Sequence, residues 1–480
     1  MRCLALAETL AETGFEPMFV SAPGTTSTVP ALGASGFPVF DCEDGMSIGQ
    51  ARSQTFAQKV RAAIIDGYHF DLDLERKARS HAETVVVCED LPNRSHDCDI
   101  LVDPTPGRSG SEYVGLAPSS TKILVGSSYA FLGRKWRDVR RLNPNRKTGL
   151  NAKQKILVSM GATDPGNGTS RVLDALATLD RNFIVDVILG PSAPHLEDIR
   201  QRCHDSEMNL LVNPQDLAER VAMADLAIGA PGSSTFERAT LGIPSVVIPT
   251  ANNQIDNAKA LHAAGAARVV PTSMLELPAK LGELIDELLR DATLRQKIGA
   301  ASHKLCDGRG THRLLCVLAG ECEARDGARL GLRLVDDSDC DWLLDLQSAP
   351  PTRRFARNTS IPTPEEHHKW FDAVLETPDR ILAIVVDVSR QEPGDDKRLG
   401  FVRLDRRLGS ASPSFDISIA ISPHLHGRGY AKAALHLARQ MAPGSEIFAT
   451  VLDENQASRA LFASAGYSQV DKELYRSAPS

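Results

Sequence analysis

A stretch suited to holding a phosphate group lies between Asp225 and Asn257. A short apolar run leads there into a glycine-containing loop, Gly229-Ala-Pro-Gly-Ser-Ser-Thr235, which opens a predicted helix. The N–H groups and the dipole at the start of a helix attract phosphate, and Glu237, one turn into the helix, could accept hydrogen bonds from ribose hydroxyls. The stretch therefore predicts a nucleotide site whose binding residues are Gly232, Ser233, Ser234, Thr235 and Glu237.

The same residues also fit a purely structural role. Ser234-x-x-Glu237 matches a capping box, which would only complete the helix. A second polar loop follows the apolar run at residues 245–248 and contains Asn253, Gln254 and Asn257. Because both loops leave the same edge of a parallel sheet, their proximity favours a ligand site for a nucleotide-linked sugar.

A second set of backbone amides is predicted near the C-terminus of the chain. Residues 416–421 alternate in polarity as a strand does, and Ser422-Pro-His-Leu-His426-Gly-Arg-Gly-Tyr-Ala431 follows them directly, before another helix. A glycine-containing turn at a helix start again suits an anionic ligand.

The elements that position these residues fall into three segments. Helical patterns alternate with short apolar runs through most of the chain, which predicts parallel α/β structure. A basic stretch at 134–155 separates the first two segments, and residues 321–327 read as a linker before a mixed α+β segment with a charged hairpin at 391–398. The predicted domains are residues 1–147, 152–320 and 329–480. The apolar runs are residues 18–20, 63–65, 85–87, 100–102, 123–125, 156–158, 184–189, 226–228 and 245–248, and then 381–388, 399–404 and 416–421.

Composition narrows the classes of function. The chain has 480 residues, 42% of them hydrophobic, and a formal net charge of -7, which argues against nucleic acid as a main partner. No apolar run approaches the roughly 20 residues needed to cross a bilayer. The nine cysteines include no Cys-x-x-Cys pair, so we expect reduced thiols and a cytoplasmic location. We also expect no bound metal and no membrane insertion.

The C-terminal segment resembles the GNAT acyltransferases. The spacing of His426, Gly429 and Ala431 is similar to the family's pyrophosphate loop, although His426 stands where glutamine or arginine is usual, and Asn455-x-x-Ser458-x-x-Leu-Phe462-x-x-x-Gly-Tyr467 looks like the family's C-terminal motif. The resemblance implies acetyl-CoA as co-substrate. It would be held by Ile419, Ile421, His426, Gly427, Arg428, Gly429, Ala431, Asn455 and Ser458.

Acetyl transfer to an amine also needs a proton acceptor and a proton donor. Asp416 is the candidate base, with a surface carboxylate as the alternative reading. Many GNAT enzymes carry a tyrosine where this chain has Phe462, which cannot protonate a thiolate. Tyr467 or Tyr430 could substitute, although ordinary packing explains both.

The first two segments resemble GT-B proteins that bind UDP-sugars, such as the glycosyltransferase that makes peptidoglycan lipid intermediates. They are more similar to the UDP-2,4-diacetamido-2,4,6-trideoxy-β-L-altropyranose hydrolases of pseudaminic acid synthesis, over roughly residues 1–275. The motifs that carry this resemblance are Asp66-Gly-Tyr68, Glu89-Asp-Leu91 with His96-Asp-Cys-Asp99, Val158-Ser-Met-Gly-Ala-Thr-Asp-Pro165 and the loop at 229–235.

That family cleaves the anomeric C–O bond with water and releases UDP. The resemblance implies that Gly161, Thr163 and Asp164 approach the phosphates, and that Asn253 and Gln254 face the sugar beside the catalytic candidates Asp66 and Tyr68. Asp164-Pro165 could also be only a turn, and Tyr68 a residue at the edge of a core. Pro231 replaces a glycine usual in the family loop and removes one amide donor.

The start of the sequence carries a further expectation. Cys3, Leu6, Ala7 and Leu10 share one helical face, so a helix precedes the first predicted strand. Family members place a strand and a glycine-rich loop before this helix, with a histidine thought to activate water. We therefore expect a first Rossmann-type domain that is truncated at its N-terminus.

Together these features predict a GT-B-like pair of α/β domains followed by an α+β GNAT domain. The expected function has two steps, N-acetylation of a UDP-linked amino sugar and hydrolytic release of UDP. The resemblance would place both in pseudaminic acid biosynthesis, which supplies flagellin glycosylation. Two alternatives stay open, namely a UDP-sugar-binding module without activity beside the acetyltransferase, and a GT-B glycosyltransferase.

Overall fold

The computed structural model describes residues 1–42, 59–142, 153–180, 183–389, 397–410 and 412–479. The described chain forms two compact units. Unit 1 comprises residues 1–5 and 18–310, and unit 2 comprises residues 6–17 and 311–480. Both the domain boundary expected at 147–152 and most of the hairpin expected at 391–398 lie outside the described residues.

The first half of unit 1 contains a parallel sheet with strand order β3-β4-β5-β6 and a separate parallel pair, β1-β2. Valine and isoleucine fill the middle of β4 and β5, where Val85, Val86, Val87 and Leu101 are buried as the apolar runs predict. The strands are β1 (Phe19–Ser21), β2 (Val39–Asp41), β3 (Val60–Asp66), β4 (Ala82–Cys88), β5 (Ile100–Asp103) and β6 (Lys122–Val125). The helices are α2 (Thr25–Thr28), α3 (Pro30–Gly33), α5 (Leu72–His81), η1 (Gly110–Tyr113), η2 (Ser127–Tyr129) and α6 (Arg134–Leu142).

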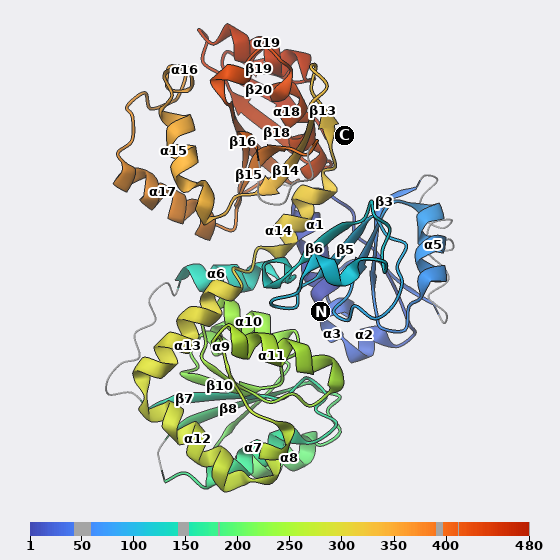
Figure 1. Cartoon of the computed structure of the whole chain (residues 1–480), viewed down its shortest axis with the longest axis vertical. Coiled ribbons are helices and arrows are strands. Elements are labelled where there is room, and N and C mark those ends of the chain that lie inside the picture. The colour runs from blue at the N-terminus through green and yellow to red at the C-terminus, as the bar shows by residue number, and fades with distance from the viewer. Residues whose placement is uncertain (43–58, 143–152, 181–182, 390–396, 411, 480) are drawn as a thin grey trace. The chain divides into compact units, whose positions relative to one another are not determined.

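The second half of unit 1 is a six-stranded parallel sheet with order β12-β11-β10-β7-β8-β9. Helices cover both faces, with α7, α8 and α12 on one and α9 and α10 on the other (Figure 1). The strands are β7 (Lys155–Ser159), β8 (Ile184–Leu189), β9 (Asn209–Val212), β10 (Leu226–Gly229), β11 (Ser245–Val247) and β12 (Arg268–Val269). The helices are α7 (Gly168–Ala177), α8 (Leu196–Asp205), α9 (Leu217–Ala222), α10 (Ser234–Thr240), η3 (Asn252–Gln254), α11 (Ile255–Ala263), η4 (Thr272–Glu276), α12 (Pro278–Arg290) and α13 (Ala292–Leu305).

The strand order of this second sheet has a functional consequence. It reverses between β7 and β10, which are neighbours although five elements of the chain separate them, namely α7, β8, α8, β9 and α9. Ser159, at the end of β7, pairs with Gly229, at the end of β10, so the loops after both strands leave the sheet side by side. Open α/β sheets bind ligands at such a reversal.

Unit 2 contains a mainly antiparallel eight-stranded sheet with order β13-β14-β15-β16-β17-β18-β20-β19. The strands are β13 (Cys322–Glu323), β14 (Arg329–Leu334), β15 (Arg380–Asp387), β16 (Arg398–Arg406), β17 (Ser414–Ile421), β18 (Glu446–Thr450), β19 (Ser468–Asp471) and β20 (Leu474–Ser477). The helices are α14 (Gly310–Leu318), η5 (Asp337–Asp339), α15 (Cys340–Ser348), α16 (Pro350–Arg353), α17 (Pro364–Glu376), η6 (Pro423–Leu425), α18 (Tyr430–Met441) and α19 (Gln456–Ser464), with most of α1 (Arg2–Glu12). The expected helix at the start of the sequence is confirmed by α1, in which Leu6, Ala7 and Leu10 are buried.

The structure corrects one expectation about connecting segments and adds to another. Residues 321–327 are not a linker, because Cys322 and Glu323 pair with β14 as the short strand β13. The start of the basic stretch at 134–155 is helix α6, in which Trp136 is only 2% exposed and packs in a core with Leu157 and Phe236. In both cases a short polar sequence contacts residues that are distant along the chain, and local pattern does not indicate such contacts.

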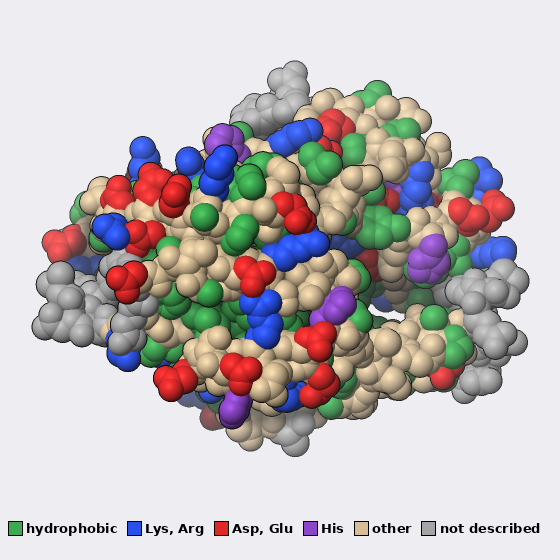
Figure 2. Space-filling model, turned by 90° about the horizontal axis from the view of Figure 1, so that it is seen from below, with side chains coloured by type: hydrophobic (Ala, Val, Ile, Leu, Met, Phe, Trp, Pro, Cys, Tyr) green, Lys and Arg blue, Asp and Glu red, His purple; other side chains and the backbone are tan. Residues whose placement is uncertain are grey.

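Cysteines, helix hydropathy and surface charge complete the description of the fold. None of the nine cysteines, all of which are described, forms a disulfide. Among the described residues no helix combines the length and apolar character that crossing a membrane requires. Acidic and basic side chains are interspersed over the face shown in Figure 2.

Candidate active sites

The loop after β10 turns where only a glycine fits. A Cβ atom on Gly229 would lie 2.4 Å from the carbonyl oxygen of Ser159 on the neighbouring strand. The amides of Thr235 and Phe236 bond the carbonyls of Gly232 and Ser233. Ser233 is exposed at the start of α10, where an anion could approach the preceding amides.

The capping box suggested by Ser234 and Glu237 is not formed. Helix α10 has Ser233 at its N-cap position with a helical backbone, and no side chain caps it. A capping serine needs an extended backbone to turn its oxygen onto the first amides. The capping box is therefore absent, and the predicted contact of these residues with UDP stays a prediction.

A buried arginine supports the loop from beneath. Arg238 is 3% exposed, and its Nη2 atom donates to the Ala230 carbonyl at 3.1 Å and to Thr235 Oγ1 at 3.2 Å. Its Nη1 atom donates to Ser234 Oγ at 3.0 Å. Burial lowers the pKa of Arg238 to about 10, so the guanidinium is still charged at neutral pH. It therefore fixes three residues of the predicted nucleotide loop.

Glu237 lies beside Arg238 and is half-buried. Burial raises the pKa of its carboxyl group to about 7, although Lys135 and Arg238 favour the charged form. At neutral pH the group is therefore present in both protonation states. Only the ionised form accepts hydrogen bonds with both oxygens, as a ribose diol would require.

The polar loop after β11 reaches both halves of unit 1. Asn257 Nδ2 donates to the Pro231 carbonyl at 2.6 Å, which ties this loop to the glycine-containing loop. Asn253 Nδ2 donates to the hydroxyl oxygen of Tyr68, which follows β3, at 3.1 Å. Gln254 instead accepts the Thr250 amide at 2.8 Å. The predicted sugar-binding residue Asn253 thus meets the predicted catalytic residue Tyr68.

The loop after β7 has a structural role for one of its three predicted binding residues. Asp164 is 6% exposed, and its carboxylate accepts the amides of Gly168 and Thr169, at 2.9 and 2.8 Å, at the start of α7. The aspartate therefore occupies the helix N-terminus that a phosphate would otherwise use. Gly161, with a φ of 130°, and exposed Thr163 remain open toward the sheet edge.

Asp66, the other catalytic candidate, is engaged by the start of the chain. Its carboxylate accepts Arg2 Nη2 at 2.5 Å, Arg2 Nε at 3.0 Å and the Cys3 thiol at 3.1 Å. Although burial opposes ionisation, the Arg2 guanidinium holds the Asp66 pKa below its ordinary value. A carboxylate in this state is charged and a weak proton acceptor.

A neighbouring carboxylate has the opposite character. Tyr68 donates its hydroxyl to Asp90 Oδ2 at 2.6 Å, while Asp90 Oδ1 is buried and has no partner among the described residues. Burial and the nearby charges of Glu89 and Asp103 raise the Asp90 pKa, against the influence of Tyr68 and Arg2. Burial and Asp90 raise the pKa of Tyr68 to about 12. Asp90 was not among the predicted site residues, although Glu89-Asp90 directly after an apolar run was a usable signal.

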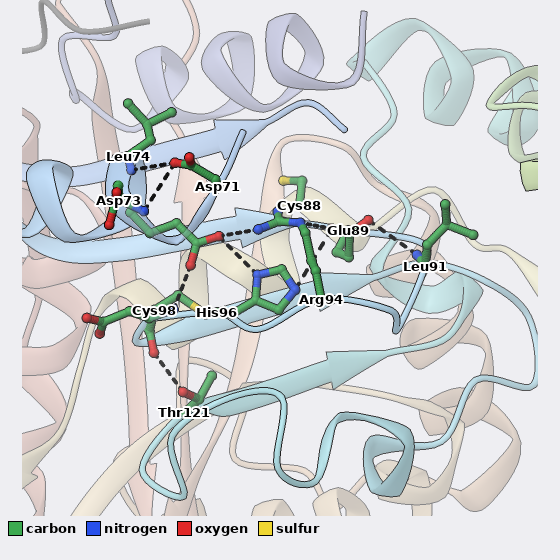
Figure 3. Close-up of polar contacts among 12 residues, drawn as sticks. Asp71, Asp73, Leu74, Cys88, Glu89, Leu91, Arg94, His96, Cys98 and Thr121 are labelled. Carbon is green, nitrogen blue, oxygen red and sulfur yellow. Dashed lines mark hydrogen bonds and ion pairs between the residues drawn. The ribbon is translucent and has the colours of Figure 1, made fainter. Parts of the chain in front are cut away.

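A buried ionic network lies next to this pair (Figure 3). Glu75, on α5, accepts Arg94 Nη1 at 2.8 Å and the Asp97 amide at 2.6 Å, and its Oε1 atom lies 3.0 Å from His96 Nδ1. Despite burial, these contacts hold the Glu75 pKa below its ordinary value. Arg94 Nε also donates to Glu89 at 3.0 Å. The network fixes Arg94 at the wall of a cavity of about 210 Å³, whose lining residues are Tyr68, Glu89, Leu91, Asn93, Arg94 and Asn253.

In unit 2 the sheet opens beside Asp416. Strand β17 pairs with β16 from Phe415 to Ile421, but it pairs with the parallel strand β18 only at Ser414, Phe415 and Asp416. Beyond this point Ile417–Ile421, including the predicted binding residues Ile419 and Ile421, have no β18 partner. Asp416 is 48% exposed and lies 3.9 Å from Arg407 Nε. The opening leads from Asp416 to the loop at 422–431.

That loop is supported by a hairpin from elsewhere in unit 2. Gly429 has a φ of 93°, and a Cβ atom there would lie 2.8 Å from the Arg325 nitrogen. Asp326, in the β13–β14 turn, accepts Arg428 Nε at 2.9 Å and the Tyr430 hydroxyl at 3.2 Å. His426 Nε2 lies 3.0 Å from the Ile421 carbonyl, so the histidine that replaces the usual residue braces the loop internally.

The second predicted motif packs around α19. Asn455 Oδ1 accepts the Ser458 amide at 3.1 Å and caps this helix, which is a structural use for both predicted binding residues. Phe462 and Tyr467 are buried with their rings 5.0 Å apart. The Tyr467 hydroxyl is buried without a partner among the described residues, and burial raises its pKa to about 12.

One group of possible metal ligands lies close together within the described residues. Donor atoms of Cys340, Asp341 and His368 lie within 4.8 Å of one another, and Asp341 and His368 are exposed. This group is remote in sequence from every predicted site residue. The expectation of no metal stays a prediction.

Two protein-family models match separate parts of the chain. The acetyltransferase (GNAT) domain family matches residues 329–468, and the glycosyltransferase family 28 C-terminal domain matches residues 170–307. The chain is a fusion. Its C-terminal part is a GNAT acetyltransferase domain, and a GT-B-like α/β region precedes it, which confirms the predicted fold class.

Three relatives extend the comparison. Uncharacterized protein MJ1062 of Methanocaldococcus jannaschii is 23% identical, over 98% of this chain and 94% of its own length. Spore coat polysaccharide biosynthesis protein SpsG of Bacillus subtilis is 26% identical over 42% of this chain and 58% of its own length. The UDP-2,4-diacetamido-2,4,6-trideoxy-beta-L-altropyranose hydrolase of Campylobacter jejuni is 23% identical over 38% of this chain and 64% of its own length. The chain therefore spans less than two thirds of the last two relatives.

Proposed function

We propose that this fusion acetylates the amino group of a UDP-linked amino sugar and then hydrolyses the product to UDP and a free acetamido sugar. The observation that carries the proposal is the presence in one chain of a GNAT domain and a region homologous to a UDP-diacetamido-sugar hydrolase. Acetylation makes the second acetamido group that such a hydrolase substrate carries. The two activities are therefore consecutive steps, which we assign to pseudaminic acid biosynthesis.

Acetyl-CoA is the proposed acyl donor. Its pyrophosphate would contact the amides of Gly427, Arg428 and Gly429, and its pantetheine arm would lie along Ile417–Ile421, where β17 has left β18. The thioester then lies beside Asp416. In the transfer the amine nitrogen bonds the acetyl carbon, the C–S bond breaks, Asp416 takes the ammonium proton directly or through water, and the CoA thiolate leaves and is protonated from solvent.

Hydrolysis is proposed for the carboxyl edge of the sheets in unit 1. UDP would contact the loop of Gly232, Ser233, Ser234 and Thr235, with its ribose on Glu237, and the sugar would face Tyr68 and Asn253. We assign proton transfer from water to Asp90, because its pKa is raised and one of its oxygens is unpartnered. Asp66, held ionised by Arg2, would stabilise positive charge at the anomeric carbon.

One incubation tests both steps. The full chain is mixed with acetyl-CoA and a UDP-4-amino-4,6-dideoxy sugar, and free CoA and UDP are measured over time. We expect both products, with UDP formation dependent on acetyl-CoA. Release of CoA without UDP would rule out the hydrolase half, and release of neither would rule out the whole proposal.

One alternative has a specific observation in its favour. The match to a glycosyltransferase family 28 domain suits a transferase that passes the sugar to an acceptor other than water. In that case an added sugar or lipid acceptor would accelerate UDP release. A UDP-sugar-binding module without activity would instead bind UDP with no turnover under either condition.

A further inference from the structure

The sheet of unit 2 carries two arginines at one end of a face whose middle is apolar. Leu382 and Phe401 lie on this face and are buried in a core with α15 and α17. Two residues away on the same strands, Arg380 and Arg403 share the face, because side chains alternate along a strand. Their side chains are 27% and 23% exposed. The arginines therefore begin where the apolar packing ends.

A single carboxylate orients both guanidinium groups. Asp405 accepts Arg380 Nε at 2.5 Å and Arg403 Nε at 2.9 Å. Because each arginine uses its Nε atom for this contact, its outer nitrogens extend beyond the carboxylate. Asp405 thus pairs with two positive charges on neighbouring strands.

A third arginine reaches the same area from the segment between α16 and α17. Arg357 is exposed, and its Nη2 atom donates to Thr450 Oγ1, at the end of β18, at 3.2 Å. Burial lowers the pKa of Arg403, and the positive charges of Arg380 and Arg357 add to this effect against the influence of Asp405. Arg403 therefore lies in the positive field of both other arginines, and a bound anion would offset that field.

The strand register relates the arginines to the predicted reaction centre. Arg403 pairs with Ser418, whose Oγ atom lies 3.4 Å from Arg403 Nη2, and Asp405 pairs with Asp416 in the cross-strand register. Thr450, the partner of Arg357, lies two residues beyond Phe448, which pairs with Asp416 on the other side. An anion bound by the arginines would thus lie on the face that carries Asp416.

We propose that Arg357, Arg380 and Arg403 form the diphosphate subsite for the acetyl acceptor on the acetyltransferase domain itself. This inference rests on the proposed function for the identity of the acceptor, a nucleoside-diphosphate-linked amino sugar. Planar guanidinium groups pair with phosphate oxygens through two parallel hydrogen bonds. The subsite is separate from the loop at 422–431, which would hold the pyrophosphate of acetyl-CoA. The chain therefore has two places for UDP, one in each unit.

Calorimetry with the full chain tests this directly. UDP is titrated in the presence of saturating CoA, which occupies the loop at 422–431. We expect two UDP sites per chain in the wild type and one in the double variant R357Q/R403Q. The single variant R357Q, in which the exposed side chain can change without disturbing the fold, should weaken the second site about 10-fold. The matched control is R329Q, because Arg329 is an exposed, ion-paired arginine on β14 of the same sheet.

Kinetics separate this inference from the proposed function. R357Q and R403Q should raise the KM for the UDP-linked amine about 10-fold or more, whereas the KM for acetyl-CoA should change less than about twofold. An unchanged UDP isotherm in both R357Q and R357Q/R403Q would overturn the subsite, even if CoA and UDP are both produced by the wild type. If the wild type produces neither but R357Q/R403Q loses one UDP site, the subsite stands and the proposed function fails.

Discussion

Two loops of this molecule share one design but differ in what supports them. Each follows a strand, contains glycines and opens a helix, at residues 229–235 in unit 1 and 422–431 in unit 2. The first is held from inside by Arg238, a buried charge one helical turn away. The second is held from outside by Asp326, which belongs to a hairpin about a hundred residues earlier in the sequence. Backbone amides at the start of a helix can therefore be held in place by a side chain that is near in the sequence or by one that is distant.

Removing Arg238, which supports the first loop, should destabilise the protein more than removing Asp326, which supports the second. R238M leaves Ala230, Ser234 and Thr235 without their shared donor, so we expect a loss of roughly 3 kcal/mol in the free energy of unfolding and a UDP affinity about 100-fold weaker. Urea unfolding and calorimetry would measure the two effects. R200M, at an exposed arginine of unit 1, should change neither. Normal UDP binding by R238M would show that the loop does not need its internal support.

The first loop should also respond to pH. With a pKa of about 7, Glu237 loses its ionised form below neutrality, so UDP binding through the unit 1 loop should be about 10-fold weaker at pH 6 than at pH 8. E237Q should remove this dependence, and a variant that keeps it would exclude Glu237 from ribose binding.

Stability gives an independent readout for the same variant. Because the pKa of Glu237 is raised in the folded state, its favourable contribution to the free energy of unfolding is complete below about pH 4.5. That contribution is lost as the pH rises through about 7. E237Q should therefore be more stable than the wild type at pH 8, by at most about 3 kcal/mol, and not at pH 4. Equal stability of E237Q and the wild type at pH 8 would show that ionising Glu237 does not destabilise the folded state.

The support of the second loop should be weaker, because its ion pair is partly exposed. D326N removes the acceptor for Arg428 and Tyr430, and we expect the KM for acetyl-CoA to rise about threefold with UDP binding unchanged. D341N, at an exposed carboxylate of the same unit, is the control. If D326N raised the KM for acetyl-CoA by as large a factor as R238M lowers the affinity for UDP, the two loops would not differ in how much they depend on their support.

The smallest effect is expected behind the second loop. Y467F removes a buried hydroxyl that has no partner among the described residues, so stability should rise by about 1 kcal/mol or stay the same. The kcat for acetyl transfer should be unchanged. A large fall in kcat, with a normal KM for acetyl-CoA, would instead identify Tyr467 as the acid that protonates the CoA thiolate.

The sequence predicted the parts of the fold that depend on local pattern. Apolar runs such as 85–87 and 226–228 are buried strands, and the glycine-containing loops follow β10 and β17 as expected. It did not predict the short strands β9, β12 and β13, which have few residues and are defined by their neighbours. A local pattern cannot report such pairings.

For the candidate sites, too, the sequence predicted some residues but not the contacts made between distant parts of the chain. The predicted residues Tyr68 and Asn253 do meet, although 185 residues separate them. The sequence did not show that Arg2 pairs with Asp66, or that Asp164 and Asn455 use their side chains to cap helices. It also missed Arg238 and Arg94, because an isolated arginine in a helix or loop is ordinarily exposed. Their importance comes from burial, which only the folded chain defines.

The hydrogen bond between Tyr68 and Asn253 has a consequence for selectivity. Each side chain satisfies the other before any sugar arrives, so an entering hydroxyl group must replace a bond of about 1 kcal/mol. A sugar with a suitably placed hydroxyl or acetamido group would restore what was broken, whereas a sugar that displaces the contact without one would leave Asn253 without its acceptor, since Tyr68 still donates to Asp90. For a sugar bound as proposed, the resting contact would therefore disfavour the wrong ligand by roughly fivefold at the binding step.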